Sequence, residues 1–121
     1  MSVTIPLPGV IQPPETTLLS TTSQTDVFTA SDKTKVVVAS ISVANTDSSG
    51  VDVTLEWDDG SSEHVFWMKG VTAKSTEIIS DLPLSLTSKY SATQKIKATA
   101  ATGNVVSITV VSIMDVSQQG R

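Results

Sequence analysis

Residues 51–58 read Val-Asp-Val-Thr-Leu-Glu-Trp-Asp, and this stretch decides the fold class because apolar and polar side chains alternate along it without a break. Successive side chains of a β-strand point to opposite sides of the sheet, so a period of two residues predicts a strand with one buried face. Residues 58–61 read Asp-Asp-Gly-Ser, a β-hairpin turn signal, and residues 63–68 supply the returning strand. The stretch predicts an antiparallel hairpin whose outer face is acidic and exposed to water.

Similar strand-like segments lie on both sides of this hairpin, at residues 16–22, 27–30, 35–44, 75–80, 93–100 and 105–115. The segments between them are rich in Ser, Asn, Asp and Gly, and no window shows the sustained 3.6-residue apolar period of an amphipathic helix. About eight strands without intervening helices predict an all-β fold. We expect an antiparallel β-sandwich of jelly-roll type, with a small closed barrel as the alternative.

The same alternation predicts which side chains enter the core. In residues 35–44 it places Val37, Ala39, Ile41 and Val43 on one face and Val36 and Val38 on the other. In residues 105–115 it places Val106, Ile108 and Val110 on one face and Val105, Val111 and Ile113 on the other. It also predicts a core position for Trp57 and opposite faces for Phe66 and Trp67.

The composition favours a folded β protein and excludes several classes of function. Val, Ile and Thr together make up 41 of the 121 residues, and Cys is absent, which excludes disulfides, thiolate metal sites and thiol nucleophiles. The formal net charge is −4, and the seven lysines are scattered, so we expect no nucleic-acid partner. No apolar run approaches the roughly 20 residues that cross a bilayer, and no secretion signal is visible, so we expect a soluble protein without a membrane partner.

The first 14 residues differ from the rest because they hold four of the five prolines. Proline removes a backbone donor and favours extended chain, so we expect residues 1–14 to form an extended arm, 15–116 a β-sandwich domain and 117–121 a short polar tail. The arm is too apolar for a solvated tail. Its candidate interface residues are Val3, Ile5, Leu7, Val10 and Ile11.

An energy comparison indicates what the arm needs in order to be held in one conformation. Fixing 14 residues costs roughly 14 to 28 kcal/mol of conformational entropy. Burying five aliphatic side chains returns roughly 8 to 15 kcal/mol. The arm therefore needs further backbone pairing or a large partner surface, as when a chain joins a neighbour's sheet edge, and the alternative is an arm packed over its own sandwich. We expect deletion of residues 1–12 to leave the domain folded but to abolish assembly.

The only histidine, His64, lies near Asp58, Asp59 and Glu63, which suggests a metal or weak calcium site beside the predicted turn. Turn geometry by itself attracts Asp, and no second His or Cys completes a ligand set. No Gly-x-Ser-x-Gly signature or glycine-rich phosphate loop is present. We therefore expect no enzyme activity and no catalytic, metal-binding or cofactor-binding residues.

Tyr90 lies in a Ser-rich turn and is the best candidate for an exposed aromatic side chain. Together with a tryptophan it could form the stacking platform of a carbohydrate-binding module, which remains an alternative function.

Six segments are informative when taken together: 43–46 (Val-Ala-Asn-Thr), 51–55 (Val-Asp-Val-Thr-Leu), 67–76 (Trp-Met-Lys-Gly-Val-Thr-Ala-Lys-Ser-Thr), 82–86 (Leu-Pro-Leu-Ser-Leu), 94–100 (Gln-Lys-Ile-Lys-Ala-Thr-Ala) and 105–113 (Val-Val-Ser-Ile-Thr-Val-Val-Ser-Ile). Through these segments, residues 37–116 resemble a family of small all-β proteins of tailed-bacteriophage particles. The resemblance implies a virion structural protein, assembled in the host cytoplasm, that binds other virion proteins and forms a homo-oligomer. Capsid decoration or cement is the expected role, with a neck or tail adaptor or fibre-attachment module as the alternative.

Overall fold

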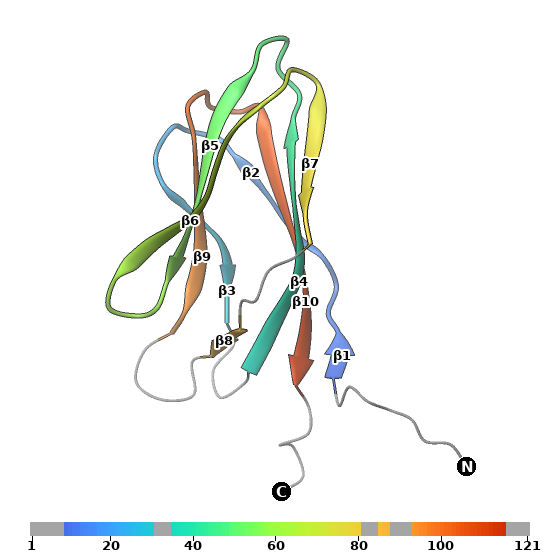
Figure 1. The fold of residues 1–121 in the computed structure, drawn as a ribbon, viewed down its shortest axis with the longest axis vertical. Coiled ribbons are helices and arrows are strands. Elements are labelled where there is room, and N and C mark those ends of the chain that lie inside the picture. The colour runs from blue at the N-terminus through green and yellow to red at the C-terminus, as the bar shows by residue number, and fades with distance from the viewer. Residues whose placement is uncertain (1–8, 31–34, 81–84, 88–92, 116–121) are drawn as a thin grey trace, which may run out of the picture.

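The structure is a computed structural model that describes the backbone of residues 9–30, 35–80, 85–87 and 93–115, and the side chains of residues 11–30, 36–80 and 93–113 (Figure 1). This part of the chain contains strands and no helix. The strands are β1 (Gly9–Ile11), β2 (Glu15–Leu19), β3 (Thr25–Thr29), β4 (Lys35–Asn45), β5 (Val51–Asp58), β6 (Glu63–Val71), β7 (Ser75–Ile79), β8 (Ser85–Thr87), β9 (Lys95–Ala100) and β10 (Val106–Asp115).

These strands form two antiparallel sheets, which confirms the predicted β-sandwich. The first sheet is built on the long pair β4 and β10. Strands β1 and β2 both pair with the free side of β10, and β7 and β8 both pair with the free side of β4. The second sheet has the order β3-β9-β5-β6. Figure 1 shows β3, β9, β5 and β6 on the left and β4, β10, β7 and β1 on the right.

The core lies between the sheets and is made of apolar side chains from both, nearly all of them aliphatic. The first sheet contributes Leu19, Val36, Val38, Ile41, Val43, Val106, Ile108 and Val110, and the second contributes Val27, Phe28, Val51, Val53, Leu55, Val71, Ile96, Ala98 and Ala100. The predicted core faces of residues 51–55 and 106–113 are confirmed, since these segments keep strict alternation. Val105, predicted on the opposite face, packs against the core. Trp57 is half-buried and packs against the core at its edge.

Strand β4 departs from the predicted alternation because it contains a β-bulge. Ser40 lies opposite Val111, but Val38 lies opposite Ser112, so Ala39 is an extra residue in the ladder. The extra residue reverses the alternation, so that even-numbered residues of β4 are buried before Ala39 and odd-numbered residues are buried after it. Val36 and Val38 are therefore buried with Ile41, while Val37 lies on the outer face, and the prediction that put Val37 with Ile41 is wrong.

Two further bulges bring neighbouring apolar side chains to the core. In β3 the pairing moves from Asp26 opposite Lys97 to Phe28 opposite Ile96, and both Val27 and Phe28 are buried. In β6, Phe66 is the extra residue between Trp67 and Val65. Phe66 and Trp67 both pack against the core, so their predicted placement on opposite faces is wrong.

Asn45 joins the two sheets at the end of β4. Its side chain is buried, and its Nδ2 donates to the carbonyl oxygens of Ser49 and Val71, each at 3.0 Å, and of Thr72 at 3.3 Å. Its Oδ1 accepts the N–H of Asp47 at 2.9 Å. One side chain therefore holds the β4–β5 and β6–β7 connections together, and both of these connections pass from one sheet to the other.

Candidate interaction surface

The candidate interface residues of the arm fall into two groups. Val3, Ile5 and Leu7 lie outside the described residues. Val10 and Ile11 belong to β1, where they lie opposite Met114 and Ile113 of β10. The N–H of Gln12 also donates to the Ser112 carbonyl at 2.9 Å. Residues 9–12 are thus hydrogen-bonded to the domain of their own chain, while the Ile11 side chain remains 72% exposed.

Ile11 is one end of a row of aliphatic side chains that crosses the first sheet. It lies opposite Ile113 of β10, which in turn lies opposite Val37 of β4. Ile113 is half-buried and Val37 is exposed, and all three are on the side of the sheet that faces away from the core. The bulge at Ala39 creates this row because it turns Val37 outward.

The row belongs to a larger surface on the outer side of the first sheet, which we call the uncharged face. It is formed by Ile11, Thr16, Leu18, Val37, Ser40, Ser42, Ala44, Thr76, Ile78, Ser107, Thr109, Val111 and Ile113. None of these side chains is charged. Lys35 and Asp115 continue the same strands beyond it, with side chains outside the described residues.

Hydroxyl groups occupy the middle of the uncharged face and aliphatic groups lie around them. Thr16, Thr109, Ser42 and Ile78 form one row across β2, β10, β4 and β7, and the hydroxyl oxygens of Thr16 and Thr109 are 3.0 Å apart. The next row is Leu18, Ser107, Ala44 and Thr76. Four of the six large apolar side chains exposed in the described part of the chain belong to this face. The described residues thus concentrate most of their large exposed apolar side chains on this one face.

Sequence reasoning did not identify this face. A signal was present, since the alternate positions Ser40, Ser42, Ala44, Ser107 and Thr109 of the two long strands carry no charge. The contributions of β2 and β7 were not visible, because strand order is set by contacts between segments far apart in the chain. The Thr16 and Thr109 hydroxyl groups, for example, are 93 residues apart in sequence.

The outer side of the second sheet carries charges of both signs. We call it the charged face, and its charged members are Asp26, Asp52, Glu56, Asp58, Glu63, Lys95 and Lys97. The cationic strand β9 lies between the acidic strands β3 and β5. Lys97 Nζ is 2.9 Å from Glu63, 3.4 Å from Asp58 and 4.0 Å from Asp26, and Lys95 Nζ is 3.1 Å from Asp26.

These ion pairs shift the titration of their members. The hydrogen bond to Glu63 raises the pKa of Lys97, and the hydrogen bond from Lys97 lowers the pKa of Glu63. The pKa of Asp58 is lowered, chiefly by the N–H of Gly60 and then by Lys97. The side-chain amide of Gln24 adds hydrogen bonds to Glu56 and Glu63. Five of the seven charged groups of this face, all but Asp52 and Glu56, therefore take part in its ion pairs.

The β5–β6 hairpin, predicted from its Asp-Gly signal, turns through a four-residue loop in which Gly60 has a φ of 97°. Asp59 accepts the N–H groups of Ser61 and Ser62, each at 2.8 Å, and its Oδ2 is 3.0 Å from His64 Nε2. These contacts lower the pKa of Asp59 to about 2. The His64 ring also packs against Trp57, with ring centroids 5.5 Å apart.

The carboxylates beside His64 do not converge on one point. Asp59 turns to the loop and to His64, whereas Asp58 and Glu63 turn to Lys97. Within the described residues no group of three or more His, Cys, Asp or Glu side chains could hold a metal ion. The hairpin contacts therefore account for these residue types by turn geometry and ion pairing.

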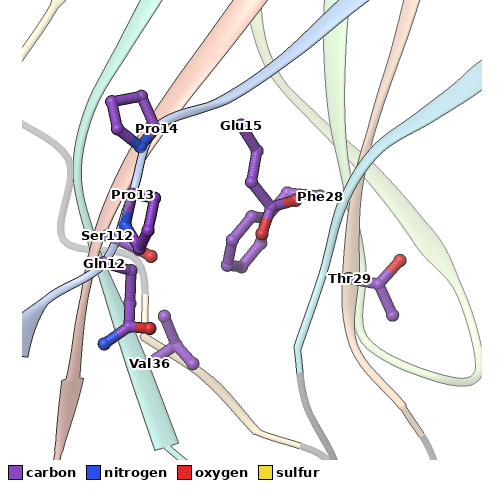
Figure 2. Close-up of a pocket in the computed structure, with 8 residues that line it drawn as sticks. All are labelled: Gln12, Pro13, Pro14, Glu15, Phe28, Thr29, Val36 and Ser112. Atoms are coloured by element: carbon purple, nitrogen blue, oxygen red, sulfur yellow. The ribbon is translucent and has the colours of Figure 1, made fainter.

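A small cavity opens where the arm meets the domain, and Figure 2 shows its lining. It has a volume of about 170 Å³ and lies between the Gln12–Glu15 segment and the residues Phe28, Thr29, Val36 and Ser112. Figure 2 shows the Phe28 ring projecting from β3 toward the segment that carries Pro13 and Pro14, with Val36 below it. The cavity is large enough for one apolar side chain.

Aromatic side chains give no stacking platform in the described residues. Phe28 is buried, and Trp57, Phe66 and Trp67 are half-buried against the core. Tyr90, the aromatic residue proposed from the sequence, lies outside the described residues.

The described part of the chain contains no helix that is long and apolar enough to span a membrane. Comparison with known protein-family models, with curated proteins and with solved structures gives no match for this chain.

Proposed function

We propose that this chain is a non-enzymatic structural protein of a phage particle, where it decorates the head as a cement protein and stabilises the shell by binding neighbouring subunits. The resemblance of residues 37–116 to virion proteins suggests the class. The observation that carries the proposal is the position of Ile11, whose exposed side chain lies on the outer side of the first sheet, at the end of an arm without charged side chains.

The geometry suggests how the arm acts. Strand β1 and the Gln12 hydrogen bond fix the end of the arm along β10, at an edge of the first sheet. The residues before Gly9 include Val3, Ile5 and Leu7. An extended segment attached to a sheet edge can add main-chain hydrogen bonds and alternate apolar side chains to a neighbouring subunit. Repetition of this contact by the symmetry of the shell multiplies a modest interface.

The structure suggests a shorter deletion than residues 1–12, one that removes the first part of the arm and leaves its contacts with the domain in place. Deletion of residues 2–8 keeps β1 and the contacts of Gln12, so the thermal unfolding of the isolated domain should be unchanged. The same deletion should abolish incorporation into particles, measured by quantitative mass spectrometry after gradient purification. Deletion of residues 117–121 is the matched control and should leave incorporation intact. Normal incorporation of the chain without residues 2–8 would overturn the proposal.

The copy number in the same particles separates the cement role from the alternative of a neck or tail adaptor. A shell protein follows the many-fold symmetry of the head, whereas a neck or tail component is present in few copies. Many copies per particle support the cement role, and few copies contradict it.

A further inference from the structure

We infer that the uncharged face is a self-association surface, through which two copies of this chain pair sheet against sheet about a twofold axis. This inference does not depend on the role in a phage particle, because it concerns the isolated protein. It assigns to this face an occupant of defined chemistry, a second copy of the same face.

The chemistry of the face is complementary to itself. In a twofold contact the same patch is present on both sides, so every group must find a suitable partner within the patch itself. Aliphatic side chains such as Leu18 and Ile78 meet this requirement by packing against one another. Hydroxyl groups such as those of Ser42 and Thr109 also meet it, because each hydroxyl can both donate and accept a hydrogen bond.

The distribution of charge favours a second copy over a charged partner. The chain has a formal net charge of −4, so two copies repel one another over most approaches. The uncharged face brings no like charges into opposition. The charged face lacks this property, because its five carboxylates outnumber its two lysines, so two copies of it carry net charge of the same sign.

The size of the face fits a weak dimer. Four strands spaced ~4.8 Å apart span ~19 Å, and the nine residues from Val106 to Met114 span ~30 Å, which gives ~570 Å² per copy. Two copies would bury ~1,100 Å² in total, close to the ~1,200 Å² at the lower end of specific interfaces. We therefore expect self-association that depends on concentration rather than a permanent dimer.

Sedimentation velocity of the full chain over a range of concentrations tests the inference. Wild type should move from the 12.7 kDa monomer to a dimer as the concentration rises. Thr109→Lys puts a charge in the middle of the uncharged face and should weaken dimerisation at least about tenfold, since each dimer would bury two lysine charges that no carboxylate of the face can pair. Thr54→Lys is the matched control, because Thr54 is a half-buried threonine on a central strand of the charged face. It should dimerise as wild type does.

A second pair of variants, at exposed positions, distinguishes a loss of dimerisation from a loss of folding. Ile78 and Met68 are 69% and 70% exposed, on the uncharged and the charged face respectively, so neither Ile78→Lys nor Met68→Lys should disturb the core. Ile78→Lys should weaken the dimer and Met68→Lys should not. A wild-type chain that stays monomeric overturns the inference and leaves the face to another protein. Dimerisation that survives both Thr109→Lys and Ile78→Lys, or that the controls weaken equally, also overturns it.

Discussion

The two outer faces of this sandwich are built on equivalent scaffolds and have opposite chemistry. Each covers the back of an antiparallel sheet whose other side packs into the same core. The face of the first sheet holds only aliphatic and hydroxyl side chains among the described residues, whereas that of the second holds four carboxylates in contact with Lys97 or Gln24. Because the core is common to both, packing cannot explain the difference. The difference supports the proposal that the charged face meets water and the uncharged face meets a protein surface.

The largest expected effect tests which side chains of β4 belong to the uncharged face. Val38 is buried and Val37 is exposed because of the bulge at Ala39. Val38→Asp places a carboxylate in the core and should lower the free energy of unfolding by more than about 3 kcal/mol. Val37→Asp, its neighbour, should change it by less than about 1 kcal/mol. Urea titration measures both, and the reverse order would show that the bulge is absent.

A smaller loss of stability is expected at the joint between the sheets. Asn45→Ala removes the donors to the carbonyl groups of Ser49, Val71 and Thr72. It should lower the free energy of unfolding by about 2 to 3 kcal/mol, because buried acceptors lose their partners. Asn104→Ala alters an exposed turn residue and should have less effect, although Asn104 has a positive φ of 67°. Equal losses in urea titration would mean that Asn45 does not hold the two connections together.

The charged face should show its ion pairs as a dependence of stability on pH. The lowered pKa of Glu63 and Asp58 means that these groups stabilise the fold when ionised, and that this contribution is lost as the pH falls through their lowered values. Lys97→Met should lower the melting temperature at neutral pH, and the difference from wild type should vanish in acid, where the carboxyl groups are protonated. Lys95→Met, which loses one contact with Asp26, is the control with the smaller effect. A constant difference at all pH values would contradict this role for Lys97.

The smallest effect is expected at the hairpin. Asp59 has its pKa lowered from 3.8 to about 2, first by the N–H groups of Ser62 and Ser61 and then by His64. Its ionised form therefore stabilises the fold above pH 3.8, and this stability is lost as the pH falls toward 2. Asp59→Asn should flatten the fall in melting temperature over this range without affecting self-association. An unchanged slope would show that Asp59 contributes nothing to acid sensitivity.

The sequence predicted the parts of this fold that depend on local alternation. Residues 51–55 and 105–113 contain no extra residue, so Val53 and Ile108 are buried as expected. The bulges were not predictable because Val27, Ala39 and Phe66 are ordinary strand residues with no local mark. The candidate surface was predicted only at its edge, through Ile11 of the arm. The rest depends on the order of strands, which single-strand patterns do not encode.

The most direct test of the account measures the accessibility of one thiol on each outer face. The chain has no cysteine, so Ile78→Cys and Met68→Cys each introduce a single thiol at positions of nearly equal exposure. In dilute solution both should react with a maleimide at the same rate. In concentrated solution the thiol of Ile78→Cys should react markedly more slowly while that of Met68→Cys keeps its rate. Slower reaction at position 68 alone, or no change at either position, would contradict the claim that the uncharged face is the one that becomes buried.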